Sequence, residues 1–156
     1  MRPGDIGAAA ELANAVHLSY PEDPAVIADR IGLYPRGCFV LEDGATLKGH
    51  LVSHPWIRRS LPALNASLGS LPAAPDCYYL HDLTILEAAR GQGHALSAVD
   101  LVVEEARACG LDTILLIAVG DAHGYWERVG FEPWSGHRVD PAKGYGPEAR
   151  AYIRRL

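Results

Sequence analysis

Cysteine is scarce in this sequence of 156 residues. Cys38, Cys77 and Cys109 are the only three, their number is odd, and no two of them form a C-x-x-C pair. That pattern argues against a disulfide framework and against a zinc site. We therefore expect no bound metal and a reducing, cytoplasmic setting.

Long apolar runs and an excess of positive charge are also missing. No stretch approaches the ~18 apolar residues needed to span a bilayer, and the first residues lack a basic segment followed by an apolar run. With 14 basic against 19 acidic side chains, the chain carries a formal net charge of -5 rather than the broad positive field of a nucleic-acid binder. We expect no targeting signal, no membrane segment and no nucleic-acid partner.

The composition is that of an ordinary globular protein. Apolar residues make up 49% and charged residues 21% of the chain, close to the average for soluble domains. A chain of this length can bury a real core but is short for two domains. Residues 1–156 are therefore expected to fold as a single domain.

Helical and strand patterns alternate along the chain. Apolar spacing, proline positions and β-branched runs set the boundaries of the expected elements. We expect helices over 5–20, 25–33, 93–109 and 121–129, and strands over 37–42, 46–53, 77–86, 113–119 and 149–156, with a further extended segment at 131–134. This order predicts a mixed α/β fold with helices on both faces of the sheet, and a long irregular loop or a short helical turn over 54–76.

A glycine-rich turn, Arg90-Gly91-Gln92-Gly93-His94-Ala95, separates the strand over 77–86 from the following helix. Glycine lets the backbone approach a ligand closely, and the start of a helix offers unpaired N–H groups and a partial positive charge. The turn can therefore bind a diphosphate, with Arg90 adding a fixed charge. Strand-to-helix turns also favour glycine for geometric reasons alone. The spacing fits neither a dinucleotide-binding fingerprint nor a P-loop.

Two segments resemble the GNAT superfamily of N-acetyltransferases. The cofactor motif of that family is Gln or Arg, two residues, Gly, one residue, then Gly or Ala, and Arg90, Gly93 and Ala95 fill it in register. A second segment, residues 122–131, looks like the family's A-x-x-x-Y-x-x-x-G-F. The resemblance covers residues 77–134 closely and the remainder by element order.

The resemblance implies the GNAT acyl-CoA N-acyltransferase fold, a mixed and mostly antiparallel sheet of six to seven strands with about four helices. In that fold two parallel central strands, here 77–86 and 113–119, splay apart, and the pantetheine arm of acetyl-CoA lies between them. The cofactor-binding residues that it implies are Leu83, Thr84, Ile85, Arg90, Gly91, Gln92, Gly93, His94, Ala95 and Trp126. It also implies acetyl transfer to a primary amine, on a small molecule, a peptide or a protein, and it allows a homodimer.

Acetylation needs a base, because only the neutral amine attacks a thioester and a lysine-like ammonium has a pKa of about 10.4. His81 is the first candidate, since its pKa suits the task and some relatives of the family place a histidine at this point of the strand. Asp82 and Tyr79 are alternatives, because a bulge would change which side chains face the cleft. His50 and His54 are weaker candidates for lining the acceptor pocket, and His17, His123 and His137 carry less weight still.

The second motif departs from the family at its tyrosine, which many relatives use as the general acid for the leaving thiolate. Trp126 occupies that position, and indole cannot act as an acid at neutral pH. The adjacent Tyr125 points roughly 100° away on a helix, so it is not a simple substitute. The alternatives for the acid are Tyr125, Tyr145 in the tail, or help from water or backbone dipoles. Two rival functions stay open: a non-catalytic acyl-CoA-binding module, and an acyltransferase that uses another acyl-CoA.

Overall fold

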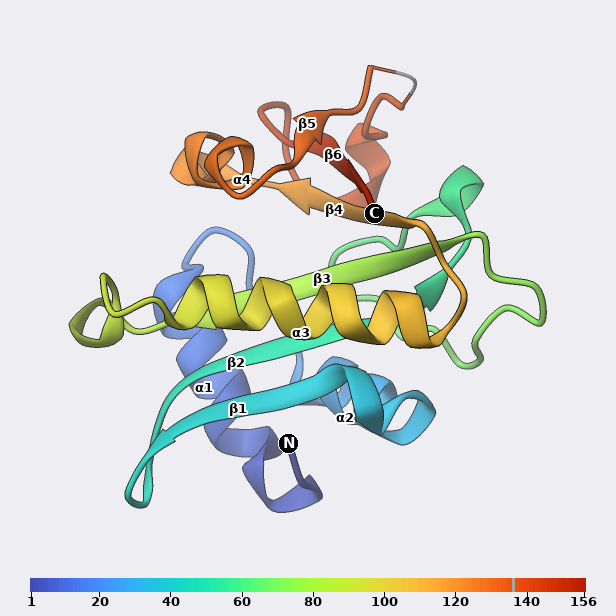
Figure 1. Cartoon of the computed structure of the whole chain (residues 1–156). Helices are drawn as coiled ribbons and strands as arrows, with labels where there is room; N and C mark the ends of the chain where they lie inside the picture. Colours follow the sequence, from blue (N-terminus) through green and yellow to red (C-terminus); the bar gives the residue numbers. More distant parts are fainter. Residues whose placement is uncertain (136) are drawn as a thin grey trace.

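The computed structural model describes residues 1–135 and 137–156. These residues form one six-stranded sheet, with the strand order β1-β2-β3-β4-β6-β5, and four α-helices (Figure 1). The strands are β1 Cys38–Asp43, β2 Thr46–Trp56, β3 Cys77–Ile85, β4 Thr113–Ala118, β5 Glu132–Pro133 and β6 Arg150–Arg155, and the helices are α1 Ile6–Val16, α2 Pro24–Leu33, α3 His94–Ala108 and α4 His123–Arg128. The mixed α/β fold expected from the sequence is confirmed.

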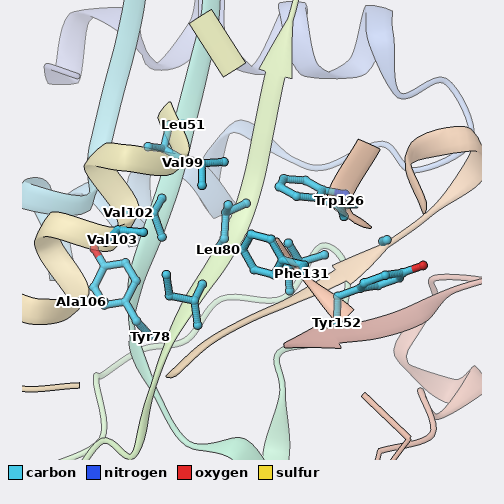
Figure 2. Packing of buried hydrophobic residues seen from close by; sticks show 13 residues of the cluster. Leu51, Tyr78, Leu80, Val99, Val102, Val103, Ala106, Trp126, Phe131 and Tyr152 are labelled. Atoms are coloured by element: carbon cyan, nitrogen blue, oxygen red, sulfur yellow. The ribbon is translucent and has the colours of Figure 1, made fainter. Parts of the chain in front are cut away.

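The helices cover both faces of the sheet. On one face, α3 contributes the stripe Val99, Val102, Val103 and Ala106 to a buried cluster that also contains strand residues and Trp126 of α4 (Figure 2). These residues recur at helical spacing, and burying each valine contributes roughly 1.5–3 kcal/mol. On the other face, α1 and α2 pack on a separate apolar cluster. The sheet is therefore packed between helices, and the side chains that project from its strands have fixed positions.

The two parallel strands of the sheet separate soon after they meet. β3 and β4 pair only at Tyr78 with Ile114 and at Tyr79 with Leu115. Beyond those pairs β3 continues to pair with β2, and β4 with β6, so the facing edges of β3 and β4 have no strand partner. Figure 1 shows the two strands running in the same direction and diverging toward their C-terminal ends. The splay expected between them is confirmed, and it opens the middle of the sheet.

The β3 strand carries a bulge at His81. Val52 of β2 pairs with Asp82 and the next residue, Ser53, pairs with Leu80, so His81 is the extra residue between them. A bulge of this kind shifts the alternation of side chains by one position. His81 and Asp82 therefore both reach the region of the splay.

The first helix is shorter than expected. It ends at Val16, with His17 as its C-cap at φ −105° and ψ 57°, rather than continuing to Tyr20. The side chain of Asn14 accepts from the backbone N–H of Glu22 (2.9 Å) and donates to the Glu22 carbonyl (3.1 Å), which turns the chain back over the end of the helix. Across the described residues, no helix combines the length and the apolarity needed to cross a bilayer.

Candidate functional site

The start of α3 is a bare helix N-terminus. Its N-cap, Gly93, has φ +85° and offers no side chain to cap the helix, and Gly91 has φ +76°. Both values lie in the left-handed region, which glycine adopts at little cost. Arg90 is held beside the turn because its Nε donates to the Ile85 carbonyl (3.1 Å). The first N–H groups of a helix of 15 residues are thus open to a ligand, with a guanidinium next to them.

A groove of about 940 Å³ leads away from this turn. The turn and the start of α3 line it with Arg90, Gly91, Gly93, His94, Ala95 and Leu96. Strand β3 adds Leu83 and Ile85. Helix α4 and the segment before it add Val119 to Ala122, Tyr125, Trp126 and Arg128. Gln92 is not part of the lining, and its side chain donates to the Ala88 carbonyl (3.3 Å). Arg90, Arg128 and His94 line the groove together with one acidic residue, Asp121, and the two guanidinium groups make the groove suitable for phosphate groups.

A second, smaller cavity of about 120 Å³ occupies the splay itself. Its walls are Leu80 to Leu83 on β3, Leu116 to Val119 on β4 and just after it, and the side chains of Ala13, His17, Tyr20, Glu22, Leu64, Ala122, Trp126 and Tyr145. Six residues line both spaces: His17, Tyr20, Leu83, Val119, Ala122 and Trp126. The groove and the inner cavity therefore adjoin where β3 and β4 part.

His81 lies in the inner cavity and is paired with a carboxylate. Its Nε2 is 3.0 Å from Glu22 Oε2, and the two side chains are 3% and 12% exposed. Burial raises the pKa of Glu22, but the hydrogen bond and charge of His81 outweigh burial and lower it overall. Glu22 is thus anionic at neutral pH, so it accepts a hydrogen from Nε2. Nδ1 of His81 is buried and has no hydrogen-bond partner within residues 1–135 and 137–156.

Asp82 is the centre of a second polar cluster. Its two oxygens lie 2.6 Å from Nε2 of His50 and 3.0 Å from the donating Thr84 hydroxyl. His17 Nε2 lies 3.5 Å from Asp82 and 3.0 Å from the Thr84 oxygen. Burial opposes the charged form of Asp82, yet His50 and His17 hold its pKa well below the usual range. Thr84, 1% exposed, faces this cluster and lines neither the groove nor the inner cavity.

The tyrosines named from the sequence differ in position. Tyr79 is 1% exposed and lines neither space, and burial raises its pKa well above the usual value. Tyr125 lines the groove with its ring, but its hydroxyl is buried and burial raises its pKa. Tyr145 lines the inner cavity, and burial raises its pKa to about 12. Trp126 forms a wall common to both spaces, with its ring edge-on to Phe131 at 5.4 Å between centroids (Figure 2).

Several residues at the site were not singled out from the sequence. His17 was only a weak candidate there, and Tyr20, Glu22 and Arg128 were not candidates. The sequence feature that could have identified the first three is the polar segment His17-Leu18-Ser19-Tyr20-Pro21-Glu22. The apolar pattern assigned most of this segment to the first helix. His54 lines neither space. Among the described residues, no group of three His, Cys, Asp or Glu side chains is placed to hold a metal ion.

Comparisons with known proteins agree with this geometry. The model of the acetyltransferase (GNAT) family matches residues 9–131. A search among curated protein sequences found no match. Similar solved structures include Ard1 from Thermoplasma volcanium (TM-score 0.74, 15% identity, 100% of this chain and 94% of that one), Naa20 of Chaetomium thermophilum with a bisubstrate analogue (0.73, 15%, 100% and 84%), and the GNAT-like decarboxylase GphF with isobutyryl-CoA (0.77, 19%, 99% and 96%).

Proposed function

This chain belongs to the acetyltransferase (GNAT) family, and from that premise we propose that it moves an acetyl group from acetyl-CoA to a primary amine by direct attack in a ternary complex. The family supports acyl transfer from an acyl-CoA donor. One observation carries the finer proposal: a long groove and a small polar cavity adjoin at the splay, so a donor and an amine can reach the same point from two sides.

The groove fits the donor in shape and charge. Its about 940 Å³ begins at the bare N-terminus of α3, where the N–H groups after Gly93 can bind phosphate oxygens and Arg90 and Arg128 can neutralise them. Leu83 and Ile85 border the part of the groove that leads to the splay. Bound there, acetyl-CoA supplies an activated acyl group as its thioester. The chain's own residues then have to exclude water, place the amine and move protons.

The inner cavity fits a cationic amine. Glu22 and Asp82 are both anionic at neutral pH, since their histidine partners lower their pKa values overall. Buried carboxylates attract an ammonium group and exclude an anion. A cavity of about 120 Å³ holds the aminoalkyl end of an acceptor rather than a large molecule. Both a small amine and the exposed amine of a peptide or protein satisfy that requirement.

His81 is the proposed general base. Glu22 holds the hydrogen on Nε2, which leaves the buried Nδ1 with a free lone pair, and His81 lines the inner cavity. Asp82 is a poorer base, because His50 and Thr84 already donate to it. Tyr79 lies outside both spaces. These contacts support His81 over the two alternatives.

The test is release of the coenzyme A thiol from acetyl-CoA in the presence of different amines. The panel contains a polyamine, free amino acids and a peptide with an unblocked N-terminus. We expect at least one amine to raise the rate well above the rate without amine. Binding of coenzyme A in calorimetry without amine-dependent release from any donor would instead identify a non-catalytic acyl-CoA-binding module. Faster release from propionyl- or succinyl-CoA would identify a different donor.

The base is tested by His81→Gln, with His137→Gln as the matched control. His137 stacks on Trp134 and lines neither the groove nor the inner cavity. Loss of a general base costs about 100-fold or more in turnover. We expect that loss in His81→Gln with unchanged coenzyme A affinity, and wild-type turnover in His137→Gln. Equal turnover in the two variants would remove His81 from the proposal. The cytoplasmic location and the homodimer stay predictions.

A further inference from the structure

A direct transfer leaves a thiolate that needs a proton, and the residue in the family's tyrosine position cannot supply it. Trp126 has only an indole N–H, which does not ionise near neutral pH. The hydroxyl of Tyr125 is buried, and Tyr145 lines the inner cavity but not the groove. The proton must therefore come from another residue where the two spaces adjoin, and His17 and Tyr20 both line the groove and the inner cavity there.

His17 lies at that place. As the C-cap of α1 it is fixed by the helix end, and it lines both the groove and the inner cavity. His81 lines only the inner cavity and His94 only the outer groove of these two spaces. The side chain of His17 is 33% exposed, so it is accessible to a ligand in the groove.

The hydrogen bonds of His17 fix which nitrogen can donate outward. The Thr84 hydroxyl gives its hydrogen to Asp82, so its oxygen accepts from Nε2–H of His17 (3.0 Å). Asp82 Oδ1 lies 3.5 Å from the same nitrogen, and His50 holds the second carboxylate oxygen. Nε2 therefore keeps its hydrogen in both protonation states, and Nδ1 carries the proton that can be exchanged.

We propose that His17 is the general acid of the reaction and delivers its Nδ1 proton to the departing sulfur, with Asp82 and Thr84 as positioning residues. This inference rests on the proposed acyl transfer. As the bond between the amine nitrogen and the acyl carbon forms and the carbon–sulfur bond breaks, the sulfur takes that proton and the imidazolium becomes neutral. The ammonium loses one proton to solvent before the attack and a second to His81 during it. His81 then releases its proton to solvent and His17 takes one up from solvent. A net of one proton is released to solvent per turnover.

The charges around His17 favour the protonated imidazole. Its hydrogen bond to Asp82 raises the pKa of His17, burial opposes this, and the Asp82 charge adds to the rise. Arg90 from the turn lowers the pKa, and Glu22 from the loop after α1 raises it. Tyr20 also lines both spaces, and His50 contacts the second carboxylate oxygen of Asp82. The net pKa is above the ordinary value of 6.5, so more of the acid form is present near neutral pH than in a free histidine.

The first experiment reads the imidazole by NMR rather than by activity. Ring C–H signals of the whole protein are titrated with pH, and His17→Gln assigns the signal. We expect His17 to titrate above 6.5 and to titrate lower in Asp82→Asn. Adding coenzyme A should shift the signal, and adding desulfo-coenzyme A, which lacks the thiol, should shift it clearly less. A signal that responds equally to the two ligands would overturn the assignment, because the sulfur would not be its partner.

The second experiment compares turnover across pH in wild type, His17→Gln, Tyr20→Phe and the control His137→Gln. We expect His17→Gln to lose about 100-fold in kcat and to lose the alkaline limb of the profile, with coenzyme A affinity retained. Wild-type kcat in His17→Gln, or loss of the alkaline limb in Tyr20→Phe instead, would overturn the inference while leaving acyl transfer intact. Absence of amine-dependent turnover in the wild-type protein would contradict the proposed function itself.

Discussion

At the scale of single residues, the interior of this protein holds histidines of opposite character. His17 has a raised pKa because Asp82 is its partner. His54 is fully buried, its Nδ1 donates to the Pro55 carbonyl (3.1 Å), and burial lowers its pKa to about 3. The first is suited to exchange a proton, whereas the second stays neutral through the physiological range.

His54 should make stability depend on pH between neutrality and pH 5. Its pKa is about 3 in the folded protein and about 6.5 in the unfolded chain, so its contribution is complete above 6.5 and is lost as the pH falls. We expect the free energy of unfolding to drop by about 2 kcal/mol more between pH 7.5 and pH 5 in wild type than in His54→Gln. Urea unfolding at both pH values measures this. Equal drops in the two proteins would show that the pKa of His54 is not lowered in the folded protein.

At the scale of elements, local sequence patterns were sufficient for the central part of the fold. The apolar stripe of α3, the continuous apolar run of β4 and the glycines between β3 and α3 each depend on near neighbours in sequence, and all three appear as expected. The splay was implied by the resemblance to a family, and the order of the strands within the sheet was not predicted. Both are non-local properties that periodicity does not encode.

The site was only partly predictable for the same reason. His81 and Asp82 could be named, because they lie in the strand before the cofactor turn. The partners of these residues, Glu22 and His17, come from a loop about sixty residues earlier in the sequence. That loop depends on where α1 ends, and the apolar pattern did not show that the helix ends at Val16.

The connection between α1 and α2 should therefore control the acceptor side through Glu22, which lines the inner cavity but not the groove. Asn14 makes two hydrogen bonds to the backbone of Glu22, and net contributions of about 1 kcal/mol each are typical. We expect Asn14→Ala to lower stability by about 2 kcal/mol and to raise the KM for the amine several-fold. The control is Glu11→Ala, an exposed position on the same helix. An unchanged KM in Asn14→Ala would show that the loop does not position Glu22 for the acceptor.

At the scale of the whole molecule, the two spaces at the splay differ in their charged side chains. The groove starts at a helix N-terminus and is lined by Arg90, Arg128 and Asp121, and the inner cavity contains Glu22 and Asp82. An anionic donor and a cationic acceptor are thus each drawn to a different side. The proposed acyl transfer and the proposed role of His17 both require that the main-chain amides at the start of α3 bind the phosphates of the donor.

The most direct measurement of that dependence is calorimetric binding of coenzyme A to Gly93→Ala and Gly110→Ala. Gly93 and Gly110 flank the two ends of α3, have φ of +85° and +70°, and have open space around an added Cβ, so the two variants carry a similar backbone cost of about 1–2 kcal/mol. We expect wild-type affinity in Gly110→Ala and at least tenfold weaker binding in Gly93→Ala. Equal affinities in the two variants, or no binding to the wild-type protein, would contradict phosphate binding at the start of α3.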